Sequence, residues 1–260
     1  MALGDHNPIV TYGTVRTIVG KHTNIDIRFD ESDDGFHLYA YDTGGMNFFV
    51  PEQVYYTDSA GTRGGFKVTN LGTSDTTLTI TYLYPNGSVI YTKSDPLPAS
   101  ATRNYIWQTE VYNSYGITDG SAIVSSTQKI AIIPYRAKNT GADMDYYKGA
   151  SMNAAGTHVI AYGLKYMDND SSTLTVSNMA SSGSTITLRF LDKNGNQIMT
   201  ITESFAGRES KRYIWKTLIY DVYGVREGSV EITSGQQTAA LISNDLSPQG
   251  RLGYISGEMI

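Results

Sequence analysis

The sequence contains no cysteine, so it cannot form disulfide bridges, zinc–thiolate sites or a cysteine nucleophile. No apolar run approaches the roughly 18 residues that a membrane-spanning helix needs. The first residues, MALGDHNPIV, lack the basic and apolar regions of a signal peptide. We therefore expect no membrane insertion, and no export signal is visible in this chain.

Charge is also scarce. Charged residues make up 17% of the 260 positions, against a usual value of ~25%, and the net charge is −5. Binding to nucleic-acid phosphates requires clustered Lys and Arg. The densest basic stretch is 208–216, which we interpret as a solvated strand edge. We therefore expect no nucleic-acid partner.

Thr, Ser, Gly, Asn and 20 tyrosines fill the composition instead, and the strong helix formers are not prominent. Hydrophobic residues make up 40% of the chain, enough for folded domains. This composition is typical of strands and turns. It predicts an all-β protein.

The chain repeats itself with a shift of 108 residues and no gap. The clearest match is YIWQTEVYNSYG at 105–116, which returns as YIWKTLIYDVYG at 213–224. Val68-Thr-Asn-Leu71 likewise matches Val176-Ser-Asn-Met179. Such a repeat predicts two copies of one structural unit, at 45–152 and 153–260, with an N-terminal extension at 1–44.

Each unit carries the pattern of short strands. Thr alternates with Leu78, Ile80 and Tyr82, as in a strand with one buried face, and Asn86-Gly87 follows as a hairpin signal in which both turn residues need positive φ. Segments 121–125 and 129–134 predict two further strands around a Ser-Thr-Gln turn. About 100 residues per unit suits an immunoglobulin-like β-sandwich. We therefore predict two such sandwiches in tandem.

The repeated aromatic motif can be interpreted in two ways. We expect a strand through 105–107 and then a short helical crossover that Gly116 ends. The aromatic side chains could form a platform for a sugar or a base, or they could fill the sandwich interior. Because the motif occurs in both units, we favour a structural role as core anchors for Trp107, Trp215, Tyr105 and Tyr213.

The order of motifs resembles a known family. FFVPE at 48–52, GFKVTNL at 65–71, PAS at 98–100 and STQKIAII at 126–133 are similar to the immunoglobulin-like repeats of bacterial secreted and cell-surface proteins. The resemblance covers residues ~45–260, on strand and turn motifs of moderate specificity. It implies scaffold or adhesive modules without catalysis.

The extension at 1–44 also has strand patterns, at 9–19, 25–29 and 36–41, with an acidic loop at 30–35. An isolated hairpin is barely stable in water. We therefore expect these strands to dock on the first repeat or on a neighbouring subunit, where they could link copies by strand addition.

The search for chemistry yields little. The four histidines are scattered, and no G-x-S-x-G motif is present. The acidic loop supplies Asp30, Ser32 and Asp34 as weak calcium candidates, but Tyr41 stands where an EF-hand loop needs a glutamate. We therefore predict no catalytic residues and no cofactor, with calcium as a minor alternative, and we do not expect an enzyme.

Together these features favour a structural or assembly protein, a subunit of a cell-surface layer, an extracellular filament or a virion. Its expected partners are other copies of itself or other surface or virion proteins. The alternative is a carbohydrate-binding or adhesion module that uses aromatic residues and sandwich-end loops. Exposure of the two tryptophans would distinguish the two hypotheses.

Overall fold

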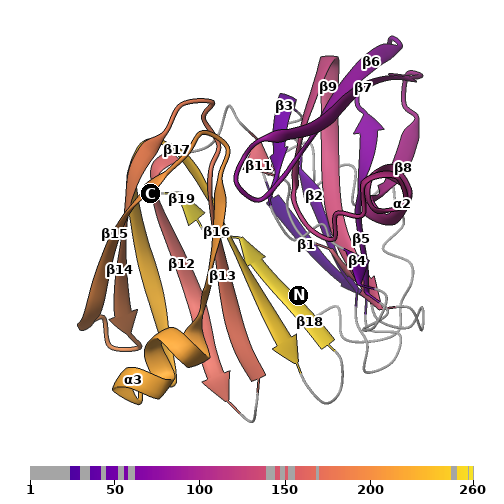
Figure 1. The fold of residues 1–260 in the computed structure, drawn as a ribbon. Coiled ribbons are helices and arrows are strands. Elements are labelled where there is room, and N and C mark those ends of the chain that lie inside the picture. The colour runs from indigo at the N-terminus through magenta and orange to yellow at the C-terminus, as the bar shows by residue number, and fades with distance from the viewer. Residues whose placement is uncertain are drawn as a thin grey trace.

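A computed structural model describes the chain over residues 24–29, 36–41, 45–51, 56–57, 62–138, 144–146, 150–151, 156–167, 170–246, 251–256 and 258–259, and its side chains over 45–51, 63–135, 156–167 and 171–243. All strand pairs in this part of the chain are antiparallel. The predicted all-β class is confirmed. Figure 1 shows two sandwiches side by side, the second repeat on the left and the first on the right.

The first repeat forms a nine-stranded sheet that folds over on itself. Its strands are β3 (Gly45–Val50), β4 (Tyr56–Thr57), β5 (Thr62–Asn70), β6 (Thr76–Leu83), β7 (Val89–Leu97), β8 (Thr102–Ile106), β9 (Ser121–Lys138), β10 (Met144–Tyr146) and β11 (Ala150–Ser151). Between β8 and β9 the chain makes a π-helical turn, η1 (Gln108–Tyr112), and one turn of helix, α2 (Asn113–Tyr115).

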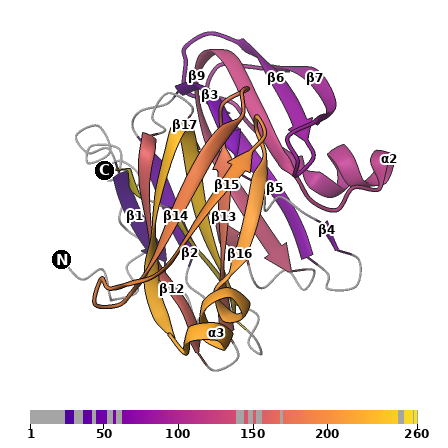
Figure 2. The same cartoon turned by 60° about the vertical axis from the view of Figure 1, so that its left-hand side comes forward.

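The second repeat forms an eight-stranded sheet of the same design. Its strands are β12 (Gly156–Met167), β13 (Asp170–Asn178), β14 (Ser184–Asp192), β15 (Gln197–Phe205), β16 (Ser210–Ile214), β17 (Glu227–Leu246), β18 (Arg251–Ser256) and β19 (Glu258–Met259). The helical segments η2 (Lys216–Tyr220) and α3 (Asp221–Tyr223) follow β16. Figure 2 shows α2 at the right edge of the molecule and α3 at the bottom.

One long strand joins the two layers of each sandwich. Residues 121–125 of β9 pair with β3 and β6, whereas residues 130–138 pair with β5. The prediction of two separate strands around a Ser-Thr-Gln turn is therefore wrong. Residues 126–128 stay in extended geometry between the two sets of pairing partners, and Thr127 N donates to Thr76 Oγ1 at 3.2 Å. In β17 the same change of partner occurs, from β14 and β12 to β13.

The alternation seen in the sequence places the cores. Leu78, Ile80 and Tyr82 are fully buried in the first sandwich, and their counterparts 186, 188 and 190 are buried in the second. Each core is one continuous cluster built from both layers. Because apolar burial is the main favourable contribution to folding, these two clusters define the two stable units of the described chain.

The Asn-Gly hairpins differ from prediction in their turns. Only the glycines have positive φ, +83° at Gly87 and +85° at Gly195, so the expectation of positive φ at both turn residues is wrong. Gly87 N donates to the Tyr84 carbonyl, as in a four-residue turn with Pro85 at its second position, where the fixed proline φ fits. A register shift between Tyr82 and Leu83 accompanies the left-handed glycine.

In the N-terminal extension, β1 (Asn24–Phe29) and β2 (Phe36–Tyr41) form the predicted antiparallel pair. The predicted strand at 9–19 and the loop at 30–35, which holds Asp30, Ser32 and Asp34, lie outside the described residues. Within the described part of the chain, no helix has the length and apolar character needed to cross a membrane.

Candidate interaction site

The repeated aromatic motif forms a buried corner in each sandwich. The Trp107 side chain is 1% exposed and its Nε1 donates to the Ile117 carbonyl at 2.8 Å. Trp215 is equally buried and donates to the equivalent carbonyl, that of Val225, at 3.1 Å. In each repeat the tryptophan follows strand β8 or β16 directly, its indole enters the core, and the chain continues into η1 or η2. The motif thus joins a strand to a helical crossover.

One glycine in each repeat lies against the indole and against a backbone carbonyl. A Cβ at Gly120 would lie 2.8 Å from the Trp107 ring and 2.2 Å from the Leu83 carbonyl oxygen. At Gly228 the corresponding distances to Trp215 and to the Leu191 carbonyl are 2.7 and 2.0 Å. Contacts this short exclude any side chain, so a backbone carbonyl and the indole together account for the matching glycines in the two units.

The tyrosines of the motif anchor polar networks at the sandwich edge. Tyr105 donates to Asp95 Oδ2 at 2.9 Å, and Arg103 forms an ion pair with the same carboxylate. Burial alone would raise the pKa of Asp95, but hydrogen bonds from Arg103 and Tyr105 hold it below its usual value. Burial, with the hydrogen bond to Asp95, raises the pKa of Tyr105, so its hydroxyl stays a donor at neutral pH.

The second repeat has the same arrangement with longer side chains. Tyr213 donates to Glu203 Oε1 at 3.3 Å, and Lys211 Nζ donates to the other carboxylate oxygen at 2.8 Å. Tyr105 and Tyr213 are 1% and 9% exposed. All four aromatic residues singled out in the sequence therefore lie in the cores. They form no open aromatic platform.

A surface that sequence reasoning missed joins the two repeats. Phe49, Leu83 and Ile123 point away from the first core, on the outer face of β3, β6 and β9. Together with Met179 and Ala239 of the second repeat they form a third buried apolar cluster. The outer face of the first sandwich is therefore covered by the second.

Polar contacts fix how the repeats meet. The turn between β15 and β16, residues 206–209, and the first residue of β16 lie against the turn between β6 and β7, residues 84–88. Ser210 N donates to the Pro85 carbonyl at 2.9 Å. A Cβ at Gly87 would lie 2.2 Å from the Gly207 carbonyl oxygen, so the two backbones touch. Arg212 forms an ion pair with Asp119 at 3.4 Å at the edge of this contact.

The sequence does contain a signal for this surface. Phe48-Phe49-Val50 and Ala122-Ile123-Val124 are apolar at every position, whereas a strand with one face in water alternates. In the second repeat Glu231 replaces Ile123 and restores the alternation in β17, whereas Ile160, which pairs with Glu231 as Phe49 pairs with Ile123, keeps β12 apolar. Comparing β9 with β17 position by position therefore predicts an outward apolar residue at Ile123 in the first repeat alone.

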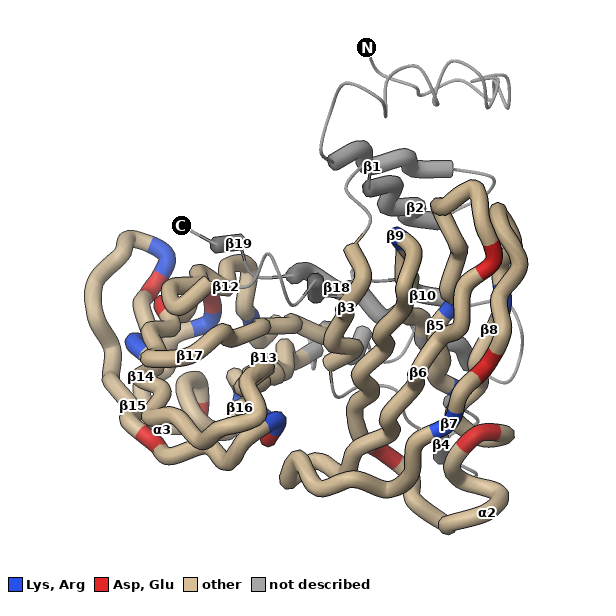
Figure 3. The backbone as a smooth tube through the Cα atoms, turned by 90° about the horizontal axis from the view of Figure 1, so that it is seen from above, with Lys and Arg blue, Asp and Glu red and all other residues tan. Residues whose placement is uncertain are grey.

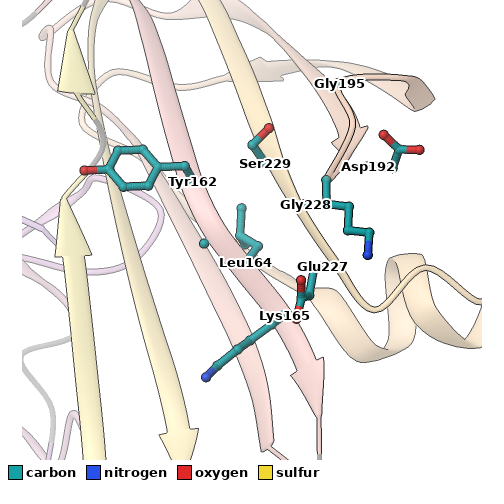
Figure 4. A pocket seen from close by; sticks show the side chains of 10 residues that line it. Tyr162, Leu164, Lys165, Asp192, Gly195, Glu227, Gly228 and Ser229 are labelled. Atoms are coloured by element: carbon teal, nitrogen blue, oxygen red, sulfur yellow. The ribbon is translucent and has the colours of Figure 1, made fainter.

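The second repeat carries an open hollow at the corresponding place. It has a volume of about 460 Å³ and lies among β12, the β14–β15 turn and the start of β17 (Figure 4). Ten residues line it: Tyr162, Gly163, Leu164, Lys165, Asp192, Lys193, Gly195, Glu227, Gly228 and Ser229. Lys193, Gly195 and Glu227 are the counterparts of Pro85, Gly87 and Asp119, which contact the second repeat.

The open sheet face beside the hollow is polar. Glu231 accepts hydrogen bonds from Arg189 Nε at 2.6 Å and pairs with His158 Nε2 at 2.9 Å. The hydrogen bond from Arg189 is the main cause that lowers the pKa of Glu231. In the first repeat Ile123 and Thr81 stand at the places of Glu231 and Arg189, and Asn47, which pairs with Ser125 as His158 pairs with Thr233, stands at the place of His158. On this face Ile123 is thus apolar where the face is covered, and its counterpart Glu231 is charged where the face is open.

Charges of both signs are interspersed along the described chain (Figure 3). The basic stretch 208–216 illustrates this, because each of its later cations has an acidic partner: Lys211 with Glu203, Arg212 with Asp119 and Lys216 with Asp221. Over the residues whose side chains are described, no three His, Asp or Glu side chains gather as a metal site would require.

No protein-family model matches the chain, and no similar curated protein is found. Solved structures share parts of its shape. A Thermotoga maritima protein designated 1070 has 12% identity and a TM-score of 0.34, covering 41% of this chain and 97% of its own. A glycosyl hydrolase family 2 member from Bacteroides cellulosilyticus has 10% identity and a TM-score of 0.16, over 81% of this chain.

A calcium-binding mutant of Bacteroides uniformis β-glucuronidase 2 has 9% identity and a TM-score of 0.18, over 88% of this chain. The matches cover 26% and 27% of the lengths of the two glycosidases. At these TM-scores the likenesses carry no inference about family or activity. The functional argument therefore depends on the surfaces of this chain.

Proposed function

We propose that this chain is a non-enzymatic structural protein that forms an assembly, as a subunit of a cell-surface layer, an extracellular filament or a virion. Its modules would associate through sandwich faces and turns, with other copies of the chain or with other surface or virion proteins as partners. The bacterial cell-surface repeats that the sequence resembles fit the same role.

The contact between the two repeats carries this proposal. It joins the outer face of one sandwich to a turn of the other, and it combines apolar burial, a backbone hydrogen bond and an ion pair. A module that packs in this way against its own copy has a surface suited to packing against further modules. The sparse charge of the chain reduces the electrostatic cost of such packing.

The alternative role as a carbohydrate-binding module has less support. Sugar-binding platforms need exposed aromatic rings, and both tryptophans are 1% exposed. The ring of Trp107 packs edge-on against Tyr82 with 5.8 Å between centroids, inside the core. These indoles contribute to folding and are not available for stacking on a sugar.

Light scattering coupled to size-exclusion chromatography at rising protein concentration tests the proposal. We expect the apparent mass to rise with concentration and negative-stain images to show ordered assemblies. A chain that stays monomeric at every protein concentration, at both low and high ionic strength, would contradict the proposal. Acrylamide quenching should also find both tryptophans shielded.

A further inference from the structure

We infer that the hollow in the second repeat receives the β7–β8 turn and the first residue of β8, residues 98–102, of a second copy of this chain, so that copies join head to tail. This inference rests on the proposed function and names the partner and the two surfaces. The contact between the repeats within one chain supplies the template. There the β15–β16 turn of the second repeat lies on the matching surface of the first.

The two turns have the same backbone form. Among the described residues, Ser100 and Arg208 are the two non-glycine positions with positive φ, at 60° and 65°, and they are exact counterparts under the 108-residue shift. A left-handed non-glycine residue is uncommon, so its presence in both turns shows that the loop shape is kept. The β7–β8 turn therefore has the shape that the surface of the first repeat already accepts from its counterpart.

The β7–β8 turn is uncovered in the single chain. Ser100 and Thr102 are exposed, whereas Ser210, the counterpart of Thr102, is buried. Leu71, beside this turn, is 45% exposed, and its counterpart Met179 is fully buried in the contact between the repeats. The β7–β8 turn of the first repeat is thus exposed, whereas its counterpart, the β15–β16 turn of the second repeat, is docked on the first repeat.

The receiving surface is uncovered in the same way. Lys193 and Gly195 are exposed, and nothing lies within 4 Å of a Cβ built at Gly195. Their counterparts Pro85 and Gly87 are partly buried by the β15–β16 turn. One copy therefore has a free turn on its first repeat and a free hollow on its second. Two such unlike surfaces on one chain give a heterologous contact, which builds rings or filaments.

The chemistry of the two surfaces is compatible. Residues 98–102 carry no charge, so the docking turn itself brings no ion into the contact. Asn104 would face Glu227 as Arg212 faces Asp119, and an amide can donate to that carboxylate. Because Glu231 replaces the apolar Ile123 of the inner contact, the outer contact buries less apolar surface. We therefore expect it to be weaker than the inner contact and reversible.

Engineered cysteines test the inference without background, because the chain has none of its own. Within one chain Pro85 and Ser210 are joined by a backbone hydrogen bond, and their counterparts across the outer contact are Lys193 and Thr102. A mixture of Lys193→Cys chains and Thr102→Cys chains should form disulfide-linked dimers severalfold faster under mild oxidation than either variant alone.

The chain offers matched controls. Pro85→Cys mixed with Thr102→Cys should give no dimers, because the turn at Pro85 is already covered by its own second repeat. The double variant Pro85→Cys/Ser210→Cys should link within one chain, which verifies the geometry of the template. Circular dichroism and thermal denaturation check that every variant folds.

The outcomes separate this inference from the proposed function. If the unmodified chain associates in light scattering but the Lys193 and Thr102 variants do not cross-link, the docking inference is overturned and the assembly role stands. If the unmodified chain is monomeric and nothing cross-links, both fail. Rapid dimer formation by Lys193→Cys alone would indicate a symmetric contact and would also overturn head-to-tail docking.

Discussion

At the scale of single residues, the two repeats differ informatively at one core position. Tyr82 stands where the second repeat has Phe190, and both rings are buried beside a tryptophan. The Tyr82 hydroxyl is buried without a hydrogen-bond partner. Burial, reinforced by the nearby Glu110 carboxylate, raises the pKa of Tyr82 far above its usual value. The second repeat shows that the fold does not need this hydroxyl.

Tyr82→Phe should therefore stabilise the protein by about 1 kcal/mol, because it removes a desolvated polar group and keeps the ring. Urea denaturation followed by fluorescence measures the change in the free energy of unfolding. As a control, Tyr105→Phe removes a hydroxyl that donates to Asp95 and should destabilise by about 1–2 kcal/mol. If Tyr82→Phe lowers stability, the hydroxyl has a partner and this account of the core is wrong.

At the scale of elements, the strand-to-helix corner shows two uses of glycine. Gly116 ends α2 with φ of +68°, and a Cβ there would meet nothing within 4 Å. Gly120 lacks positive φ but lies against the indole of Trp107 and a backbone carbonyl. The first glycine is required by backbone conformation and the second by space.

Substitution of each glycine by alanine separates these causes. Gly116→Ala should cost about 1 kcal/mol, the price of a left-handed alanine in open space. Gly120→Ala should cost more, roughly 2–3 kcal/mol, because the backbone carbonyl cannot move away from the new methyl group. Thermal denaturation of both variants, with Gly224→Ala and Gly228→Ala as matched controls in the second repeat, measures the difference. Equal losses at the two sites would contradict this distinction.

How far the sequence predicts these elements depends on how local their causes are. Alternation fixes the buried face of β6, and the motif at 105–116 predicts the corner, because both depend on neighbouring residues. The pattern at 126–128 predicts a turn where β9 in fact continues, since the pairing partners β3 and β5 that keep it extended are distant in sequence. The contact between the repeats was missed for the same reason. Its residues belong to strands whose outward faces meet only after folding.

At the scale of the whole molecule, the two sandwiches form one coupled body. The cluster of Phe49, Leu83, Ile123, Met179 and Ala239 contains residues from both repeats. Its position outside both cores means that each repeat buries part of its surface only in the presence of the other. Unfolding of one repeat therefore exposes apolar surface on its neighbour, which couples their stabilities.

Ile123→Glu copies the residue found at the matching place in the second repeat and puts a charge into this cluster. We expect a loss of about 3 kcal/mol, because the carboxylate has no cation in the apolar contact. Calorimetry should resolve two unfolding transitions for this variant, whereas we expect one for the unmodified chain. The reverse change, Glu231→Ile on the open face, should alter stability by less than about 1 kcal/mol. A single unshifted transition for Ile123→Glu would mean that this cluster does not couple the stabilities of the repeats.

The continuity of β9 and β17 across both layers has a mechanical consequence. A sandwich made of two separate sheets can separate along the plane between them. Here the covalent backbone runs from one sheet into the other, so that plane is closed along one edge. Tension applied to one sheet is passed to its partner, and a module of this kind should yield to a pulling force in one step rather than sheet by sheet.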